Sequence, residues 1–156
     1  MPRRALGGLI RTCPHSTSLL VGTAALLAAN GLAPVATAVS PPWTLLGIVP
    51  ITLGAALALA VNRAFRAAGT GINPTDPPTA LVTGGVFRFS RHPMYLGMTL
   101  AIGGAALMLG SLGALLAAAG YAAFVDRCFA APEDRRLARR FGAAYDAYAL
   151  RVRRWL

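Results

Sequence analysis

The feature of this sequence that most limits its fold is the distribution of its fixed charges. The 156 residues include 15 arginines, no lysine and five acidic residues. These charges fall into three groups, which leave two uncharged runs, Thr12 to Asn62 and His92 to Val125. A helix needs about 20 apolar residues to cross the roughly 30 Å hydrocarbon core of a membrane. The first run is long enough for two spans and a turn, and the second for two shorter spans.

The composition supports a membrane protein, because only 13% of the residues are charged and 56% are hydrophobic, against roughly 25% charged in a soluble domain. Proline lacks the N–H that a helix interior needs, so Pro41-Pro42 separates the first pair of spans, and the glycines at 110 and 113 supply a turn for the second. We therefore predict an all-α integral membrane protein that forms a single domain over residues 1–156. Its four predicted spans are Ser18 to Ala38, Trp43 to Asn62, Met94 to Leu109 and Leu112 to Phe129.

The arginines also predict the orientation of the chain, because cationic residues in short loops stay on the cytoplasmic side. Four spans place all three charged groups, and both termini, on that side. The net charge of +10 then faces anionic lipid headgroups, so we expect membrane lipids as partners, no nucleic acid and no obligate protein partner. The use of arginine alone favours a G+C-rich bacterial genome, hence a bacterial cytoplasmic membrane. A cleaved signal peptide that begins at Arg3 and Arg4 and ends near Ala38 is the alternative for the first span.

Polar groups concentrate in residues 67–156, whereas residues 1–66 read as a two-helix scaffold of small and aliphatic residues. The stretch from Gly84 to Gly97 carries two arginines, a histidine and three aromatic residues just before an uncharged run. Pro93 suits the first turn of the third span. Arg91 and His92 should then sit at the amino end of that helix, where free N–H groups and the helix dipole favour an anion.

After the fourth span, the residues from Glu133 to Val152 predict one amphipathic helix along the membrane surface. Its inward stripe recurs at three- and four-residue steps and comprises Glu133, Leu137, Phe141, Tyr145, Tyr148 and Val152. Four arginines point mainly away from that stripe, toward the headgroups: Arg135, Arg136, Arg139 and Arg140.

Two motifs carry a resemblance to a known family. The segment from Ala80 to Gly97, which contains Arg91-His92-Pro93-Met94-Tyr95, and the later segments Glu133 to Tyr148 and Arg151 to Leu156 resemble the isoprenylcysteine carboxyl methyltransferase family and its bacterial relatives. The similarity runs from Ala67 to the C-terminus. It implies an integral membrane methyltransferase that holds S-adenosylmethionine at the cytoplasmic face. By the same resemblance, the residues that bind this cofactor are Leu81, Val82, Phe87, His92, Pro93, Met94, Tyr95 and Glu133.

One departure from that family leaves the acceptor open. The eukaryotic members carry a substrate-binding arginine one turn before the glutamate, and Phe129 stands at that position. Arg127 is the nearest substitute and Arg91 is the other residue that could orient the substrate. The acceptor is small or lipophilic, and a carboxylate of the isoprenylcysteine type, a thiol and a phospholipid amine all remain possible.

Two other functions stay open at this point. An NADPH-dependent sterol-type reductase has a partly similar Arg-x-Pro-x-Tyr-x-Gly pattern, and a membrane scaffold could keep the fold without any activity. The sequence contains no metal-ligand cluster, and methyl transfer needs no metal.

Overall fold

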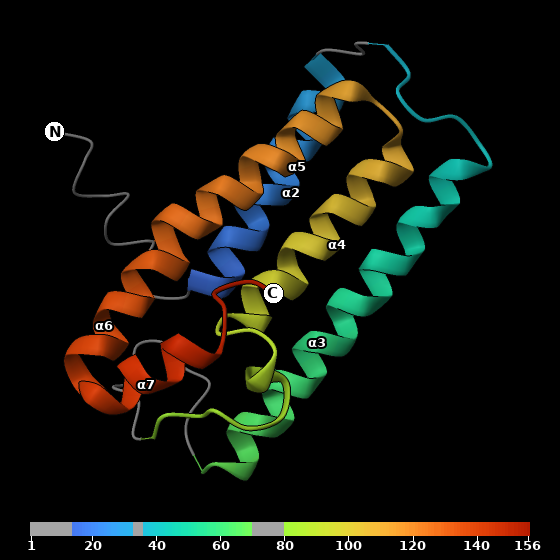
Figure 1. Cartoon of the computed structure of the whole chain (residues 1–156). Coiled ribbons are helices and arrows are strands. Elements are labelled where there is room, and N and C mark those ends of the chain that lie inside the picture. The colour runs from blue at the N-terminus through green and yellow to red at the C-terminus, as the bar shows by residue number, and fades with distance from the viewer. Residues whose placement is uncertain (1–13, 33–35, 70–79) are drawn as a thin grey trace, which may run out of the picture.

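The computed structural model describes residues 14–32, 36–69 and 80–156. Every named element in those ranges is a helix (Figure 1), which confirms the all-α prediction. The α-helices are α2 (Pro14–Leu32), α3 (Ile48–Ala67), α4 (Pro93–Leu109), α5 (Leu112–Val125), α6 (Ala131–Phe141) and α7 (Ala143–Arg151). Two 3₁₀ turns, η1 (Trp43–Gly47) and η2 (Gly85–Arg88), and one π-helical turn, η3 (Asp126–Ala130), complete the order.

The bundle is built from α2, α3, α4 and α5 (Figure 1), and its closest contact joins α3 to the antiparallel α4. Gly54 on α3 faces Gly97 on α4, and a methyl group added at Gly97 would lie 2.8 Å from the carbonyl oxygen of Gly54. Gly47 of η1 and Gly104 of α4 face each other in the same way. Each of them lies seven residues from the glycine of the first pair on its side. Small residues let helix backbones approach closely in lipid, where burial of apolar surface drives little association. Glycine at these positions therefore sets the spacing of α3 and α4.

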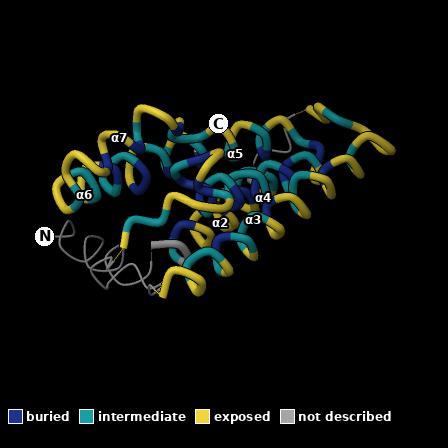
Figure 2. The backbone as a smooth tube through the Cα atoms, turned by 60° about the horizontal axis from the view of Figure 1, so that its bottom comes forward, coloured by how far each residue is buried: buried dark blue, intermediate teal, exposed yellow. Residues whose placement is uncertain are grey.

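Two helices are long and apolar enough to cross a membrane, Trp43–Ala67 and Leu112–Phe141. Two shorter helices, Thr17–Gly31 and Pro93–Leu109, are also apolar. Exposed residues run along the outer sides of the bundle helices (Figure 2), and many of them are leucine or valine. A lipid-facing surface explains such exposure, which would be costly in water. The structure thus supports two spans, and the four-span topology with both termini cytoplasmic stays a prediction.

The predicted boundaries hold best for the third span, since α4 begins one residue earlier and ends at the same residue. The first predicted span is too long, because Ala38 is not helical. The backbone N–H groups of Ala38 and Val39 instead donate to the carbonyl oxygen of Gly110, at 2.8 and 3.0 Å. Gly110 adopts a left-handed conformation with φ 66°, which glycine reaches without steric cost. These bonds tie the two predicted turns together at one end of the bundle.

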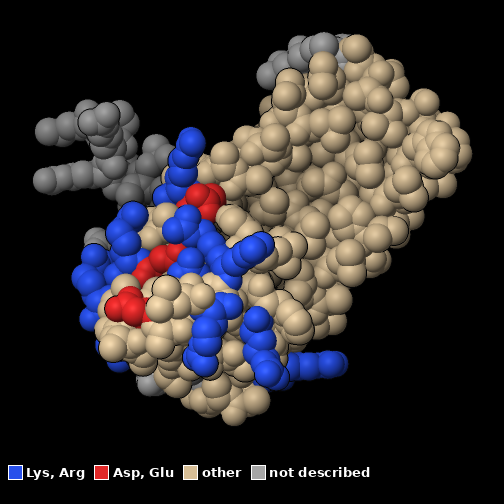
Figure 3. Space-filling view, viewed as in Figure 1, with Lys and Arg blue, Asp and Glu red and all other residues tan. Residues whose placement is uncertain are grey.

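The charged residues that the structure describes lie toward the opposite end of the molecule. In Figure 3 the arginines and acidic residues gather over α6, α7 and the start of α4, while the rest of the bundle surface shown is free of them. The helix that begins at Leu112 continues without a break through η3 into α6, and the first charged residue along it is Asp126. Residues of α6 therefore lie beyond the apolar part of this helix, on the polar side of the boundary.

The prediction of one helix from Glu133 to Val152 is wrong, because the chain turns at Gly142 with φ 51° and ψ −131°. That conformation is strained for any residue with a side chain, so glycine permits a break between α6 and α7. The break folds α7 back, and Tyr145, Tyr148 and Val152 form a buried cluster. The four predicted surface arginines of α6 are all exposed, as expected.

The segment after α7 returns to the start of α4. The backbone N–H of Arg91 donates to the carbonyl oxygen of Arg153 at 3.0 Å, and the hydroxyl of Ser90 donates to that of Arg154 at 3.1 Å. The indole N–H of Trp155 donates to Oδ1 of Asp126 at 2.9 Å. The start of α4, the η3 turn and the last residues of the chain are thus joined into one unit.

Candidate active site

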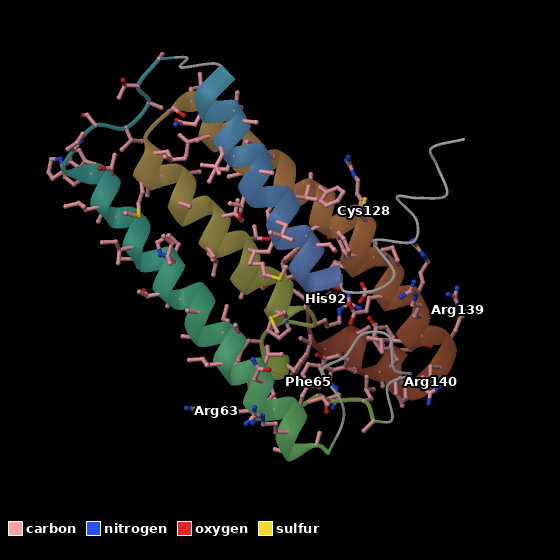
Figure 4. The ribbon with its side chains drawn as sticks, turned by 180° about the vertical axis from the view of Figure 1, so that it is seen from behind. Arg63, Phe65, His92, Cys128, Arg139 and Arg140 are labelled. Carbon is pink, nitrogen blue, oxygen red and sulfur yellow. The ribbon has the colours of Figure 1, made fainter. Side chains whose placement is uncertain are left out.

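The residues around the start of α4 form the most polar buried region that the structure describes. Pro93 occupies the first turn of α4, and His92 is its N-cap residue. The backbone N–H of His92 is satisfied by the hydroxyl of Ser90 at 3.2 Å. His92 is buried with only 4% of its surface exposed, so its imidazole needs a partner inside the protein. Figure 4 shows His92 at the meeting point of the bundle and the C-terminal helices.

Asp134 on α6 supplies that partner and is the centre of the site. Its Oδ1 lies 2.8 Å from Nε2 of His92 and also accepts a hydrogen bond from the hydroxyl of Tyr145. Its Oδ2 accepts a hydrogen bond from Nε of Arg154 at 2.8 Å and lies 3.7 Å from a terminal nitrogen of Arg91. Three parts of the chain that are far apart in sequence therefore converge on one carboxylate.

This environment controls the charge of Asp134. Burial raises the pKa of the Asp134 carboxyl, but the hydrogen bonds from His92, Tyr145 and Arg154 and the charge of His92 outweigh burial, so the pKa lies well below its usual range. Burial and the neighbouring carboxylate raise the pKa of the Tyr145 hydroxyl. Asp134 is therefore ionised and Tyr145 is a neutral donor at physiological pH.

Arg91 links this network to the interior. One terminal nitrogen donates to the Tyr145 hydroxyl at 3.1 Å, and the guanidinium lies 5.9 Å from the centre of that ring. Its Nε is buried and has no hydrogen-bond partner among the described residues. A buried donor without a partner is costly, which makes this N–H available to an anionic group at the start of α4.

Glu133 takes a different direction from its neighbour Asp134. Its Oε2 accepts a hydrogen bond from the Tyr95 hydroxyl on α4 at 2.9 Å. The Tyr95 ring lies 5.6 Å from the His92 ring and 6.1 Å from that of Phe129. Glu133 is half-buried, so it sits at the edge of an aromatic layer that separates the polar network from the bundle core.

Two neighbouring cavities lie on the other side of this region. The first, called here the apolar cavity, has a volume of about 650 Å³ between the last turns of α3 and residues 81–86. Its lining is mostly apolar and includes Ala60, Ala64, Leu81 and Val82, with Arg63 as its one charged residue. The second, called here the basic cavity, has a volume of about 520 Å³, and its lining includes Arg88, Tyr148 and Arg151. Residues 83–85 line both cavities.

Phe87 is buried and comes directly after Val86, which lines the apolar cavity. Its ring packs edge-on against Phe65 of α3 with centroids 5.5 Å apart, and its carbonyl oxygen accepts a hydrogen bond from the Tyr148 hydroxyl at 2.7 Å. Burial raises the pKa of Tyr148 to about 12, so this tyrosine also acts as a neutral donor. The η2 turn is thereby held between α3 and α7.

The structure brings some of the predicted site residues together and leaves others apart. His92, Pro93, Tyr95 and Glu133 lie around one centre, with Met94 packed against the adjoining hydrophobic core. Leu81 and Val82 line the apolar cavity, whereas Phe87 is buried and lines neither cavity. Arg91 joins the Asp134 network, whereas Arg127 is exposed and none of the contacts described above involves it.

The residues that sequence reasoning missed are Asp134 as the centre, Tyr145 as its donor and Arg154 as its ion-pair partner. The adjacent acids at 133 and 134 were a signal that either could face inward. Arg154 lies in a basic segment with no local pattern that distinguishes it, so the sequence offered no signal for its role. Among the residues that the structure describes, no group of three His, Cys, Asp or Glu side chains could hold a metal ion.

A family model for phospholipid methyltransferases matches residues 43–144, more than half of the chain. The chain belongs to the phospholipid methyltransferase family. The matched range holds η1 to the start of α7, and hence His92, Tyr95, Glu133 and Asp134, whereas Tyr145 and Arg154 lie beyond it. The resemblance to isoprenylcysteine carboxyl methyltransferases is confirmed at the level of the membrane methyltransferase superfamily that includes both families. Searches of curated proteins and of solved structures found no significant match.

Proposed function

We propose that this protein transfers a methyl group from S-adenosylmethionine to the amine of a phospholipid headgroup at the membrane surface. The observation that carries the proposal is the coincidence of the phospholipid methyltransferase match with a buried polar network at the boundary between charged and apolar surface. A lipid headgroup and a water-soluble cofactor can meet at such a boundary. Both members of the reacting pair then reach the site without crossing the bilayer.

The chemistry of the residues fits this cofactor. S-adenosylmethionine offers a carboxylate, an ammonium group, ribose hydroxyls and a flat adenine ring. The unpaired Nε–H of Arg91 suits the carboxylate, and the half-buried carboxylate of Glu133 suits a donor such as the ammonium or a ribose hydroxyl. Leu81 and Val82 in the apolar cavity suit the adenine ring. Pro93, Met94 and Tyr95 would form the wall at the start of α4.

The cofactor supplies a methyl group on a positively charged sulfur. Transfer to an unprotonated amine forms a nitrogen–carbon bond and breaks the sulfur–carbon bond. The positive charge passes from the sulfur to the methylated nitrogen, and a neutral thioether remains. The attacking amine must be unprotonated, and its lone pair must point along the breaking bond. The protein would contribute mainly by holding the two groups in line, which can lower a barrier by on the order of 7 kcal/mol.

Phe129 favours an amine acceptor over an isoprenylcysteine carboxylate. The related carboxyl methyltransferases use an arginine at this position, and here the side chain is 5% exposed and packs between Tyr95 and Phe124. A carboxylate brought to this place would meet aromatic rings instead of a cation and would pay the cost of burial without a partner. An unprotonated amine carries no charge, so its burial at this place costs less than that of a carboxylate.

The test is calorimetric binding of S-adenosylmethionine, and separately of NADPH, to the full chain purified in detergent. Wild-type protein is expected to bind S-adenosylmethionine only, and Glu133→Gln is expected to weaken that binding by about tenfold, as the loss of a charge-assisted hydrogen bond requires. Asp146→Asn is the matched control, because Asp146 is an exposed acid on α7. NADPH binding would favour the reductase, and binding of neither cofactor by folded protein would favour a scaffold.

A further inference from the structure

The basic cavity is a second polar site that the proposed chemistry leaves without a role. Its two cationic residues come from separate elements, Arg88 from η2 and Arg151 from the end of α7. The remaining lining residues are Thr83, Gly84, Gly85, Tyr148 and Val152. No acidic residue of the described part of the chain lines this cavity, so its two positive charges are not offset within it.

The arginines near the two sites differ in whether an acid of the described ranges pairs with them. Arg91 and Arg154 are neutralised by Asp134, and Arg154 also lies 3.4 Å from Asp126. In contrast, Arg88 and Arg151 form no ion pair with any acid in the described ranges, and Nε of Arg151 donates to the carbonyl oxygen of Ala147 at 3.2 Å. Two cations that share one cavity repel each other unless an anion lies between them. The cavity therefore has the charge and the space to hold an anion.

Apolar side chains beside Arg88 and Arg151 indicate which kind of anion would fit this cavity. Phe89 follows Arg88 and is 74% exposed, and Leu150 precedes Arg151 and is 89% exposed. Phe89 follows η2 and Leu150 lies in α7, so both are outside the four helices of the bundle. An exposed aromatic or leucine next to an arginine is the arrangement of a surface that inserts into lipid, with the cation at the level of the phosphates.

The position of the basic cavity matches the proposed reaction. Residues 83–85 form a common wall with the apolar cavity, where Leu81 and Val82 would meet the cofactor. In a phosphatidylethanolamine headgroup, the amine is two carbons beyond the phosphate ester oxygen. A phosphate held in the basic cavity would thus present the amine to that common wall.

We propose that the basic cavity binds the phosphate diester of the acceptor phospholipid, through Arg88 and Arg151, while Phe89 and Leu150 contact its acyl chains. This inference rests on the proposed function for the identity of the acceptor, but lipid binding itself does not require turnover. Guanidinium groups suit phosphate oxygens because they can donate two parallel hydrogen bonds. Arg88 and Arg151 set the position of the headgroup and do not take part in the methyl transfer itself.

The test measures binding of a fluorescent phosphatidylethanolamine in detergent micelles, and the dependence of methylation on the surface concentration of phosphatidylethanolamine in mixed micelles. The variant is Arg88→Gln with Arg151→Gln. The matched control is Arg135→Gln with Arg139→Gln, which removes the same charge from exposed positions on α6 that line neither cavity; Figure 4 shows Arg139 at the outer surface. We expect the cavity variant to raise the lipid Kd and KM by about tenfold or more, with S-adenosylmethionine affinity unchanged, and the control to change neither.

Lysine at both cavity positions should restore part of the binding, because it keeps the charge and loses the bidentate geometry. Inorganic phosphate and glycerophosphoethanolamine serve as competitors, and only weak competition is expected if the acyl chains contribute. Strong competition by inorganic phosphate would show a free-phosphate site and overturn the lipid assignment. Equal losses in the cavity variant and the control, or no loss in either, would also overturn it. A wild-type protein that binds lipid but no S-adenosylmethionine would refute the proposed function and leave the lipid site in place.

Discussion

Asp134→Asn is the substitution that most directly tests the network at the start of α4. The asparagine has nearly the same shape, but it removes the negative charge that faces Arg91 and Arg154 and leaves a single amide oxygen for three donors. Loss of one partner of a buried ion pair costs about 3–5 kcal/mol. The Arg154 side chain is 36% exposed, so water takes over part of its solvation and the lower end, about 3 kcal/mol, applies. For a chain of this size that corresponds to a decrease in Tm of about 6–12 °C.

The pH dependence of this effect has a definite sign. The pKa of Asp134 is lower in the folded protein than in the unfolded chain, so its contribution to stability is complete above the unfolded value and is lost as pH falls through the folded value. The difference in Tm between the wild type and Asp134→Asn should thus be present at neutral pH and should shrink below about pH 4, the ordinary carboxyl pKa.

Thermal unfolding followed by tryptophan fluorescence in detergent, at several pH values, measures both quantities. Asp146→Asn is the control and should change the free energy of unfolding by no more than about 0.5 kcal/mol, since this acid is exposed. If Asp134→Asn melts like the wild type at neutral pH, the network does not stabilise the fold as argued. If it melts lower but the difference persists unchanged at pH 3, the ionised carboxylate is not the cause.

Three further predictions follow from particular contacts. Gly97→Ala should destabilise the bundle by about 1–3 kcal/mol, because its methyl group would meet the α3 backbone. Gly103→Ala on the same helix would meet nothing within 4 Å and should be neutral or stabilising. Unfolding of the two variants in detergent measures the difference. Arg91→Gln should lower kcat/KM by about tenfold or more, and Arg127→Gln should leave it unchanged, because only Arg91 joins the site; equal effects in a methylation assay would contradict this. Tyr148→Phe removes a buried hydrogen bond and should cost about 1 kcal/mol of stability, and a wild-type Tm would show that the bond contributes nothing.

Patterns within a helix could be predicted from the sequence because they depend on nearby residues. The start of α4 followed from Pro93 and the charge boundary, and the turn at Gly110 followed from its glycines. Burial of Tyr145 and Tyr148 followed from a repeat of three and four residues, although the helix that carried this repeat was assumed to be continuous. The break at Gly142 preserved the repeat within α7 and changed only the direction of the helix.

What could not be predicted depends on contacts between distant segments. Asp134 contacts His92, which is 42 positions away in the sequence, and Arg154, which is 20 positions away. Local periodicity cannot predict contacts over such separations. The π-helical turn from Asp126 to Ala130 adds a further shift, because a wider turn rotates every later residue relative to an α-helical count. A helical wheel drawn from the start of the fourth span would therefore misplace the residues of α6.

The two adjacent acids of α6 show that a shift of one position along a helix changes which partners a side chain reaches. Successive side chains on a helix point about 100° apart, so Glu133 reaches α4 and Asp134 reaches α7 and the last residues of the chain. An ionised carboxylate has about four lone-pair positions, and Asp134 has three filled by hydrogen bonds with Arg91 near the fourth. It has no capacity left for a ligand and acts as a fixed anchor for His92 and Arg91. Glu133 accepts one such bond, from Tyr95, within the described ranges, so it is the member of the pair that retains capacity for a cofactor. Asp134 would hold α6 in place and so keep Glu133 in position. A substitution at Asp134 should then weaken cofactor binding indirectly, even though Asp134 would not touch the cofactor.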